Sequence, residues 1–320
     1  MMFASFFARF FRIHNYILQR VPGWKFSYAD ERLDWMGKNR LKLWKLSLGA
    51  ERKTKVVIRW YRNICLELIL GNDASKLIYV GGWMEPNELL AAQKILKPGM
   101  TVIDVGANEG HFSLFFGSLV GLQGAVLAVE PSPRELVALR RNVALNPGAP
   151  VLVEEQACGD RQGEATLLVA DEEHRGQNTL GNFVYECTGL VSRERVGLTT
   201  LDALVAKHKL RHVHFIKIDV EGAEAKVLEG ARHTLAIFRP VLLVELLEPA
   251  LRQQGSSGAL LTLALRKSGY AILALREQNG LWECRQENSC EPLSENILAV
   301  PLAGKEHYLE LLNRDEAHGI

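Results

Sequence analysis

The sequence has no excess of charge of one sign, few cysteines and no long hydrophobic run. Its 38 lysines and arginines are matched by 37 aspartates and glutamates, so the formal net charge is only +1. Without a basic excess or a basic run, the chain lacks the electrostatic footprint of a nucleic-acid-binding protein. We therefore expect no nucleic-acid partner.

The five cysteines include no C-x-x-C pair, which argues against a structural zinc site. Their number is odd, and a reduced chain accounts for them most simply. The alternative is a disulfide between Cys284 and Cys290 in an oxidising compartment, which no other feature of the sequence supports. We therefore expect a cytoplasmic protein.

The first twenty residues are rich in aromatic side chains but fit neither a signal peptide nor a membrane span. Arg9 and Arg12 interrupt the apolar stretch, and no small-residue cleavage site follows. Five phenylalanines and Ile17 fall on one face of a helix, which would be amphipathic. We expect this face to pack on the chain's own core or on a second subunit, as a homo-oligomer contact. The alternative is peripheral contact with a membrane surface.

Residues 1–80 predict an extension ahead of the main domain. Residues 21–55 carry enough apolar side chains for packed helices. Short strands at 56–61, 64–70 and 77–80 indicate a β-hairpin cap, with the last two joined by a turn at 71–73. We assign residues 81–320 to a single domain.

From Thr101 onward, strands and helices alternate as they do in a parallel sheet covered by helices on both faces. The predicted strands are 101–105, 125–129, 151–156, 214–218, 240–246, 270–275 and 296–300. A further strand-like segment at 281–285 indicates an antiparallel hairpin at the end of the sheet. The predicted helices are 87–96, 110–120, 133–145, 201–209, 224–235 and 259–267. The pattern predicts an α/β fold with a doubly wound, seven-stranded, Rossmann-like sheet.

The alternation is interrupted between residues 157 and 200. Two strands at 164–169 and 195–200 enclose a polar loop. Because a long irregular insertion in a compact domain is usually functional, we expect this loop to cover the substrate.

A glycine turn after the strand at 101–105 marks the first candidate site. Gly106 and Gly110 bracket the turn and a helix follows at once, an arrangement that favours ligand binding at the helix N-terminus. A dinucleotide fingerprint would require glycine at 108 and 111, where the chain has Asn108 and His111. The turn therefore favours a ligand with an amino-acid portion, such as S-adenosylmethionine, whose ammonium group backbone carbonyls and Asp104 would meet.

A second candidate, Glu130, ends the next strand, about twenty residues beyond the turn, where a carboxylate accepts hydrogen bonds from ribose hydroxyls. Nicotinamide enzymes use the same device. Glu130 could instead balance the dipole of the helix that follows Ser132. Gln156 and Ala157 lie where an adenine ring would stack.

The segment 215–231 carries the third candidate group, in the sequence FIKIDVEGAEAKVLEGA. Asp219 follows a strand and therefore faces the crevice at the carboxyl ends of the sheet. Lys217 shares its face of the strand, and a buried lysine needs an anionic partner. We expect Glu245, near the end of the next strand, to be that partner. Glu221 follows Asp219 within one turn.

These motifs resemble those of the FkbM-type S-adenosylmethionine-dependent methyltransferases. The matching segments are VIDVGAN at 102–108, EPS at 130–132, TLD at 200–202 and IKIDVEGAE at 216–224. The resemblance implies a methyltransferase fold and S-adenosylmethionine as the cofactor. For most characterised members it also implies methyl transfer to a hydroxyl oxygen, so the acceptor partner would be a hydroxyl-bearing small molecule or glycan: a sugar, a glycolipid or a natural product.

The resemblance also assigns residues to the site. Asp104, Gly106, Asn108, Gly110 and Glu130 would hold the cofactor, and we add Ala107, Ser132, Gln156 and Ala157 from their positions beside the same strand ends. Lys217, Asp219, Glu221 and Glu245 would line the reaction site. His111 stands where an aromatic residue is frequent in the family.

Methyl transfer is an in-line displacement, so the protein mainly positions the acceptor and removes its proton. We expect Asp219 or Glu221 to be the general base or to orient the acceptor hydroxyl, with Lys217 and Glu245 shaping the local charge. The same three carboxylates could instead bind Mg²⁺, but structural ion pairs produce such clusters as well, and we predict no metal. A non-catalytic scaffold protein with this fold is the alternative function.

Overall fold

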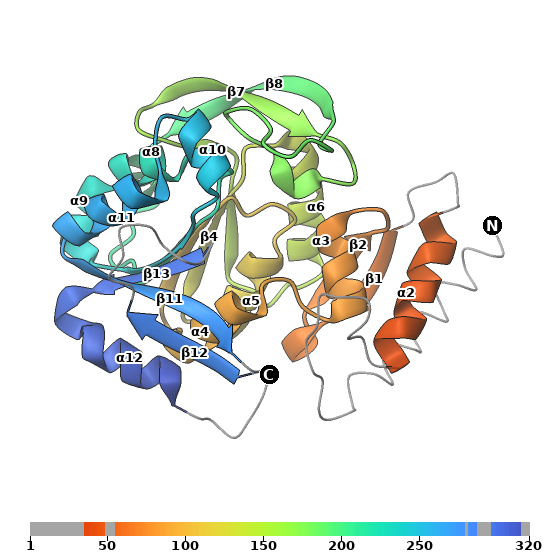
Figure 1. Ribbon diagram of the computed structural model, residues 1–320, viewed down its shortest axis with the longest axis horizontal. Helices are drawn as coiled ribbons and strands as arrows, with labels where there is room; N and C mark the ends of the chain where they lie inside the picture. The colour runs from red at the N-terminus through yellow and green to blue at the C-terminus, as the bar shows by residue number, and fades with distance from the viewer. Residues whose placement is uncertain (1–34, 49–54, 279–280, 287–295, 315–320) are drawn as a thin grey trace.

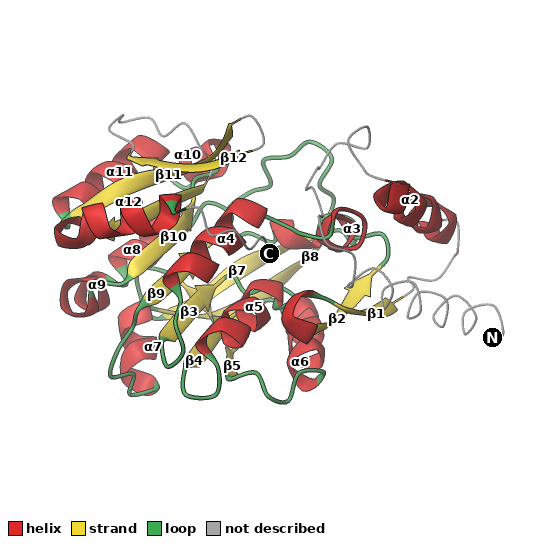
Figure 2. Ribbon diagram, turned by 90° about the horizontal axis from the view of Figure 1, so that it is seen from below, coloured by secondary structure: helices red, strands yellow, loops and turns green. Residues whose placement is uncertain are grey.

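The computed structural model describes residues 35–48, 55–278, 281–286 and 296–314 (Figure 1). The predicted amphipathic helix at the N-terminus and Cys290 lie outside the described residues. The described chain begins with α2 (Trp35–Leu48) and the hairpin β1 (Lys55–Arg59) and β2 (Cys65–Ile69). These elements lie at the opposite end of the molecule from α9 and α11 (Figure 2). None of the described helices is long and apolar enough to span a bilayer.

The main sheet has eight strands in the order β12–β11–β13–β10–β9–β3–β4–β5. Its parallel strands are β3 (Thr101–Val105), β4 (Ala125–Val129), β5 (Val151–Glu154), β9 (Phe215–Ile218) and β10 (Val241–Glu245). The antiparallel strands are β11 (Tyr270–Gln278), β12 (Leu281–Gln286) and β13 (Asn296–Pro301). The doubly wound, seven-stranded sheet predicted from the sequence is confirmed, and the predicted hairpin strand is the eighth strand.

Helices cover both faces of this sheet, as alternating buried positions along its strands require. Val102 belongs to a core that includes α4 (Pro86–Ile95), α5 (His111–Val120) and α12 (Lys305–Asn313). Ile103 belongs to the opposite core, with α7 (Leu201–Lys207), α8 (Glu224–Glu229), α9 (Arg232–Phe238), α10 (Glu248–Gln253) and α11 (Gly258–Lys267). A smaller core lies under α6 (Pro133–Ala144).

The sheet has its topological switch point between β3 and β9. The chain runs from β3 outward through β4 to β5, then returns to β9 on the other side of β3. Open α/β sheets bind ligands at such a point, beyond the carboxyl ends of the strands. Gly106 follows β3 there with φ +82°, and a Cβ on it would lie 1.7 Å from the carbonyl oxygen of Asp219. Glycine is therefore required because the two strand ends approach each other closely.

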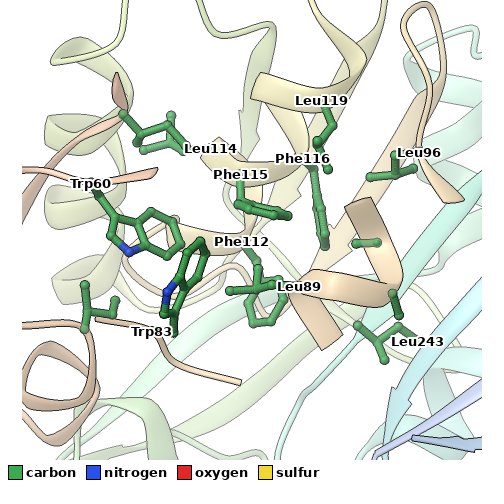
Figure 3. Packing of buried hydrophobic residues seen from close by; sticks show 14 of the residues in the cluster. Trp60, Trp83, Leu89, Leu96, Phe112, Leu114, Phe115, Phe116, Leu119 and Leu243 are labelled. Atoms are coloured by element: carbon green, nitrogen blue, oxygen red, sulfur yellow. The ribbon is translucent and has the colours of Figure 1, made fainter. Parts of the chain in front are cut away.

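An aromatic cluster joins the N-terminal hairpin to the helix that follows the glycine turn (Figure 3). The rings of Trp60 and Trp83 are 5.2 Å apart, and Trp60 lies 6.0 Å from Phe115 of α5. The indole N–H of Trp60 donates to the carbonyl of Gly82 at 2.8 Å. The hairpin thus buttresses α5 and, through it, the glycine turn.

The prediction of a strand at 77–80 is wrong. This segment is η3 (Leu77–Gly81), a π-helical turn that continues α3 (Asp73–Lys76). The side chain of Asn72 accepts a hydrogen bond from the backbone N–H of Ser75, so it caps a helix. Asparagine followed by aspartate signals a helix start as well as a turn, and here the helix forms. The hairpin pairs β1 with β2 instead.

The single helix predicted at 224–235 is in fact two helices, α8 and α9. Asp202, at the start of α7, accepts hydrogen bonds from the backbone N–H groups of His233 and Thr234 and from the Thr234 hydroxyl. A carboxylate from a distant segment therefore caps a new helix N-terminus. The helix α10 was not predicted.

The insertion between β5 and α7 forms a small sheet of its own. It contains β6 (Ala157–Cys158), β7 (Gly163–Ala170) and β8 (Leu190–Thr199), with the short helix η4 (Arg175–Gln177) in the connection. The strands β7 and β8 lie across the top of the molecule in Figure 1.

Candidate functional site

A cavity of about 350 Å³ opens at the switch point. Ten of the predicted site residues line it: Gly106, Ala107, Asn108, Glu130, Gln156, Ala157, Lys217, Asp219, Glu221 and Glu245. Residues 173–178 of the insertion line it as well, which supports the prediction that this loop covers the site. The volume falls within the range of small-molecule sites.

The three other predicted residues, Asp104, Gly110 and Ser132, are not among the residues that line the cavity. Asp104 is fully buried beside Lys217 on the neighbouring strand, and it accepts a hydrogen bond from the Ser113 hydroxyl at 2.5 Å. The contact of Asp104 with a ligand ammonium group stays a prediction, and the Asp104 Oδ1 atom has no partner among the described residues. A Cβ on Gly110 would lie 2.4 Å from Leu139, so this glycine permits α6 to pack closely. Ser132 is buried behind Glu130.

Backbone hydrogen bonds hold the Glu130 carboxyl group in place. One oxygen accepts from the N–H of Asn108 at 2.9 Å and the other from the N–H of Ser132 at 2.8 Å. Burial raises its pKa to about 8, although these two N–H groups oppose the shift. The group therefore holds a proton at neutral pH, and its carbonyl oxygen has a second lone pair with which Glu130 can still accept from a ligand.

Three residues that line the cavity have the left-handed backbone conformation without being glycine. Their φ angles are 51° at Glu85, 49° at Asn108 and 53° at Glu221. Such backbone is costly and is typical of functional sites. At Glu221 the carbonyl oxygen accepts from the Thr179 hydroxyl at 2.8 Å and the Gln254 amide at 3.3 Å, so the insertion and the segment after α10 hold it.

Lys217 pairs with Asp219 and not with Glu245, which corrects the sequence prediction. The Lys217 ammonium group lies 2.6 Å from the Asp219 carboxylate and 4.8 Å from the centre of the Phe112 ring. Burial alone would raise the pKa of Asp219, but the Lys217 charge, together with hydrogen bonds from Lys217 and Glu245, lowers it below the usual value. Asp219 is therefore ionised at neutral pH.

The other carboxyl groups at this end of the cavity have shifts of the opposite sign. Oxygen atoms of Asp219, Glu221 and Glu245 lie within 4.8 Å of one another. Burial, followed by the Asp219 charge, raises the pKa values of Glu221 and Glu245 well above the usual range. The same two causes raise the pKa of Glu85 to about 8. These three groups keep their protons at neutral pH while no cation approaches them.

His111 is a site residue for which the sequence analysis predicted no role. It begins α5, lines the cavity and is only 8% exposed, with its ring 5.0 Å from that of Phe112. Burial, followed by the Lys217 charge, lowers its pKa to about 3, so the imidazole is neutral. Its Nε2 atom has no partner among the described residues. The departure from the family's aromatic residue was the only signal in the sequence.

Arg175 of η4 is a second residue that the sequence did not single out. Its guanidinium group is buried and contacts Glu109 at 3.2 Å, Glu135 at 2.6 Å and Glu172 at 3.2 Å. Glu109 belongs to the glycine turn and Glu135 to α6. Asn72, ahead of α3, also donates to Glu109, at 3.1 Å. Arg175 therefore links the insertion to the glycine turn and to α6.

Three lining residues present buried polar atoms that no described residue satisfies: Asn108 Oδ1, His111 Nε2 and Glu245 Oε2. Buried polar atoms normally have partners. The Asn108 oxygen can only accept hydrogen bonds, and the His111 Nε2 atom accepts one when the ring proton is on Nδ1. The cavity therefore fits a ligand that offers N–H and O–H donors, as S-adenosylmethionine does.

The chain is similar to a known protein family. The methyltransferase FkbM domain matches residues 104–272, slightly more than half of the chain. This range contains the glycine turn, Glu130, the insertion and the Lys217–Asp219 pair.

The chain is also similar to individual proteins, either over a short segment or at low sequence identity. Protein-L-isoaspartate O-methyltransferase 1 of Arabidopsis thaliana is 35% identical over 88 residues, which are 26% of this chain and 38% of that protein. The chain thus spans well under half the length of this relative. The FkbM methyltransferase of Methylobacillus flagellatus has 14% identity and a TM-score of 0.39, over 71% of this chain and 54% of that one. Fibrillarin of Aeropyrum pernix, solved with S-adenosyl-L-methionine, has 13% identity and a TM-score of 0.39, over 79% and 85%.

Proposed function

The chain belongs to the FkbM methyltransferase family, and we propose that it transfers the methyl group of S-adenosylmethionine to a hydroxyl oxygen of a sugar, glycolipid or natural product. When bound, this cofactor supplies an electrophilic methyl group on a sulfonium. The observation that carries the proposal is that the glycine turn and the Lys217–Asp219 pair face the same cavity at the switch point of the sheet.

The cofactor would lie along the β3 and β4 ends of the cavity. The Glu130 carboxyl group would form hydrogen bonds with the ribose hydroxyls, because it is held rigidly by two backbone N–H groups. The side chain of Asn108 would accept from the amino-acid portion through its unpartnered oxygen. Gln156 and Ala157, beyond the end of β5, would contact the adenine ring.

Asp219 is the best supported proton acceptor for the acceptor hydroxyl. Lys217 keeps it ionised, whereas the raised pKa of Glu221 leaves that group protonated and unable to act as a base. Lys217 also fixes the Asp219 carboxylate through their 2.6 Å contact. We propose that Glu221 and Glu245 orient the acceptor, with no role in removing its proton.

The test combines calorimetry with S-adenosylhomocysteine and a methyl-transfer screen over hydroxylated acceptors. We expect the wild type to bind this product and to methylate an acceptor. The variant Asp219→Asn should bind S-adenosylhomocysteine almost as tightly and should lose activity by about 10²–10⁴-fold, the usual contribution of a general base. Glu229→Gln, on an exposed part of α8, is the matched control and should be fully active.

Each outcome separates the alternatives. Failure of the wild type to bind S-adenosylhomocysteine would overturn the methyltransferase proposal. Tight binding without transfer to any hydroxylated acceptor would favour the scaffold function. An Asp219→Asn variant with the activity of the wild type would exclude Asp219 as the base.

A further inference from the structure

We propose that the acceptor carries an ammonium group near its reacting hydroxyl, and that Glu85, Glu221 and Glu245 form the subsite that receives this positive charge. The inference rests on the proposed function and adds the chemical class of the acceptor: an amine-bearing, hydroxylated molecule such as an amino sugar.

The balance of charge around the cavity is the first observation. Eight carboxyl groups line it, from Asp73, Glu85, Glu130, Glu135, Glu173, Asp219, Glu221 and Glu245. The only permanent cations among the described lining residues are Lys217 and Arg175. S-adenosylmethionine adds one net positive charge, and carboxyl groups still outnumber cations. Glu85, Glu221 and Glu245 hold protons while no cation pairs with them, and an ammonium group of the acceptor would favour their ionised forms.

Neither of the two cations forms an ion pair with Glu85, Glu221 or Glu245, although the Lys217 charge acts on Glu85 and Glu221 from a distance. Arg175 is occupied by three other carboxylates, those of Glu109, Glu135 and Glu172. The Lys217 ammonium group forms a hydrogen bond with Asp219 and with no other described side chain. Among the described residues, Glu221 and Glu245 therefore lie within 4.8 Å of Asp219 without a cation of their own.

His111 is the second and independent observation. Its imidazole is more than nine-tenths buried, lines the same cavity and leaves Nε2 without a partner. Burial and Lys217 keep it neutral, so Nε2 can accept a hydrogen bond when the proton is on Nδ1. An ammonium group offers three N–H donors, and His111 and Glu245 both offer buried atoms that lack a partner.

The backbone holds two of the three acids in position before any ligand arrives. Glu85 and Glu221 both have positive φ angles, a conformation that persists only when the surroundings impose it. The hydrogen bonds from Thr179 and Gln254 impose it at Glu221. A pre-organised group of acceptors binds a cation without further ordering cost, and it repels an anionic acceptor.

The test uses three probes that share a sugar ring: glucosamine, glucose and glucuronic acid. Each is titrated calorimetrically into the full chain saturated with S-adenosylhomocysteine. We expect glucosamine to bind at least about tenfold more tightly than glucose, because its ammonium group would donate hydrogen bonds to acceptors that otherwise have no partner. Glucuronic acid should bind most weakly. Glu245→Gln and Glu221→Gln should each reduce the preference for glucosamine, whereas the surface variant Glu229→Gln should retain it. Thermal unfolding of each variant checks that it is folded.

Three results would overturn the proposal. The first is glucosamine that fails to bind or binds no better than glucose, and the second is a preference for glucuronic acid. The third is stoichiometric binding of Mg²⁺ or Mn²⁺, titrated alone, that is lost in Glu245→Gln, because the carboxylates would then form a metal site. Failure of S-adenosylhomocysteine to bind would instead overturn the proposed function, so the two failures are distinguishable.

Discussion

Arg175 and Lys217 are both buried cations near several carboxyl groups, but they differ in how many of those groups they form ion pairs with. The planar guanidinium group of Arg175 contacts three carboxylates, and one of these, Glu135, also pairs with Arg134. The ammonium group of Lys217 forms an ion pair only with Asp219 among the described side chains, although Glu221 and Glu245 lie beside that carboxylate.

The difference separates a structural cluster from a functional one. The Arg175 cluster links the insertion, the glycine turn and α6, and its cation is saturated. The Lys217 cluster is open, because its acids outnumber its cation and lie in a cavity. Charged groups that lack a partner therefore indicate a functional site, whereas the number of charges in a buried cluster does not.

Arg175→Met should give the largest loss of stability in this comparison. Removal of the guanidinium group leaves buried carboxylates without their partner, which typically costs about 3–5 kcal/mol in the free energy of unfolding. Urea denaturation of the wild type and the variant measures it. Arg195→Met is the matched control, because Arg195 pairs with Glu164 on the exposed surface of the same insertion. An equal loss in both variants would remove the distinction between buried and exposed pairs.

Lys217→Met should cost less stability than Arg175→Met, about 1–3 kcal/mol, the typical cost of leaving a buried polar group unsatisfied. The neighbouring carboxyl groups can keep their protons, which relieves part of the repulsion, but methyl transfer should be lost because Asp219 is no longer held ionised. The same urea experiment measures the first effect. A loss larger than that of Arg175→Met would show that the Lys217 cluster is the more important one for folding.

The pH dependence of stability should identify the open cluster. Burial, together with Asp219, raises the pKa of Glu85 from 4.5 to about 8, and the folded state therefore holds its proton more tightly than the unfolded state. The resulting stabilisation is complete below pH 4.5 and is lost as the pH rises toward about 8. Glu85→Gln should make the fall in unfolding free energy between these values shallower. An unchanged slope would exclude Glu85 as a source of this pH dependence.

The smallest effect is expected at the surface. Arg232 pairs with Glu229 at 2.7 Å, and their side chains are 76% and 53% exposed. Such pairs contribute about 0–1 kcal/mol, so Arg232→Met should change the unfolding free energy within this range. Added salt should reduce any difference further. A loss comparable with that of Lys217→Met would mean that exposure does not rank these ion pairs.

Much of the fold could be predicted because the signals are local. The strand predicted at 101–105 is β3 to the residue, since a continuous apolar run bounded by a glycine turn specifies a buried parallel strand. The error at 77–80 arose where one dipeptide, Asn72–Asp73, suits both a turn and a helix start. The helix break before Arg232 could not be predicted, because its cap, Asp202, is about thirty residues away in the chain.

The sequence by itself determined where the cavity lies, because parallel strands bring their carboxyl ends to one edge and each end carries its own motif. It therefore placed Glu130, Asp219 and Glu245 around one site. Only the tertiary structure decided which charges are satisfied. The pairing of Lys217 with Asp219, the fastening of Arg175 and the buried, unpartnered imidazole of His111 depend on distances between side chains from separate elements, and no spacing in the sequence encodes those distances.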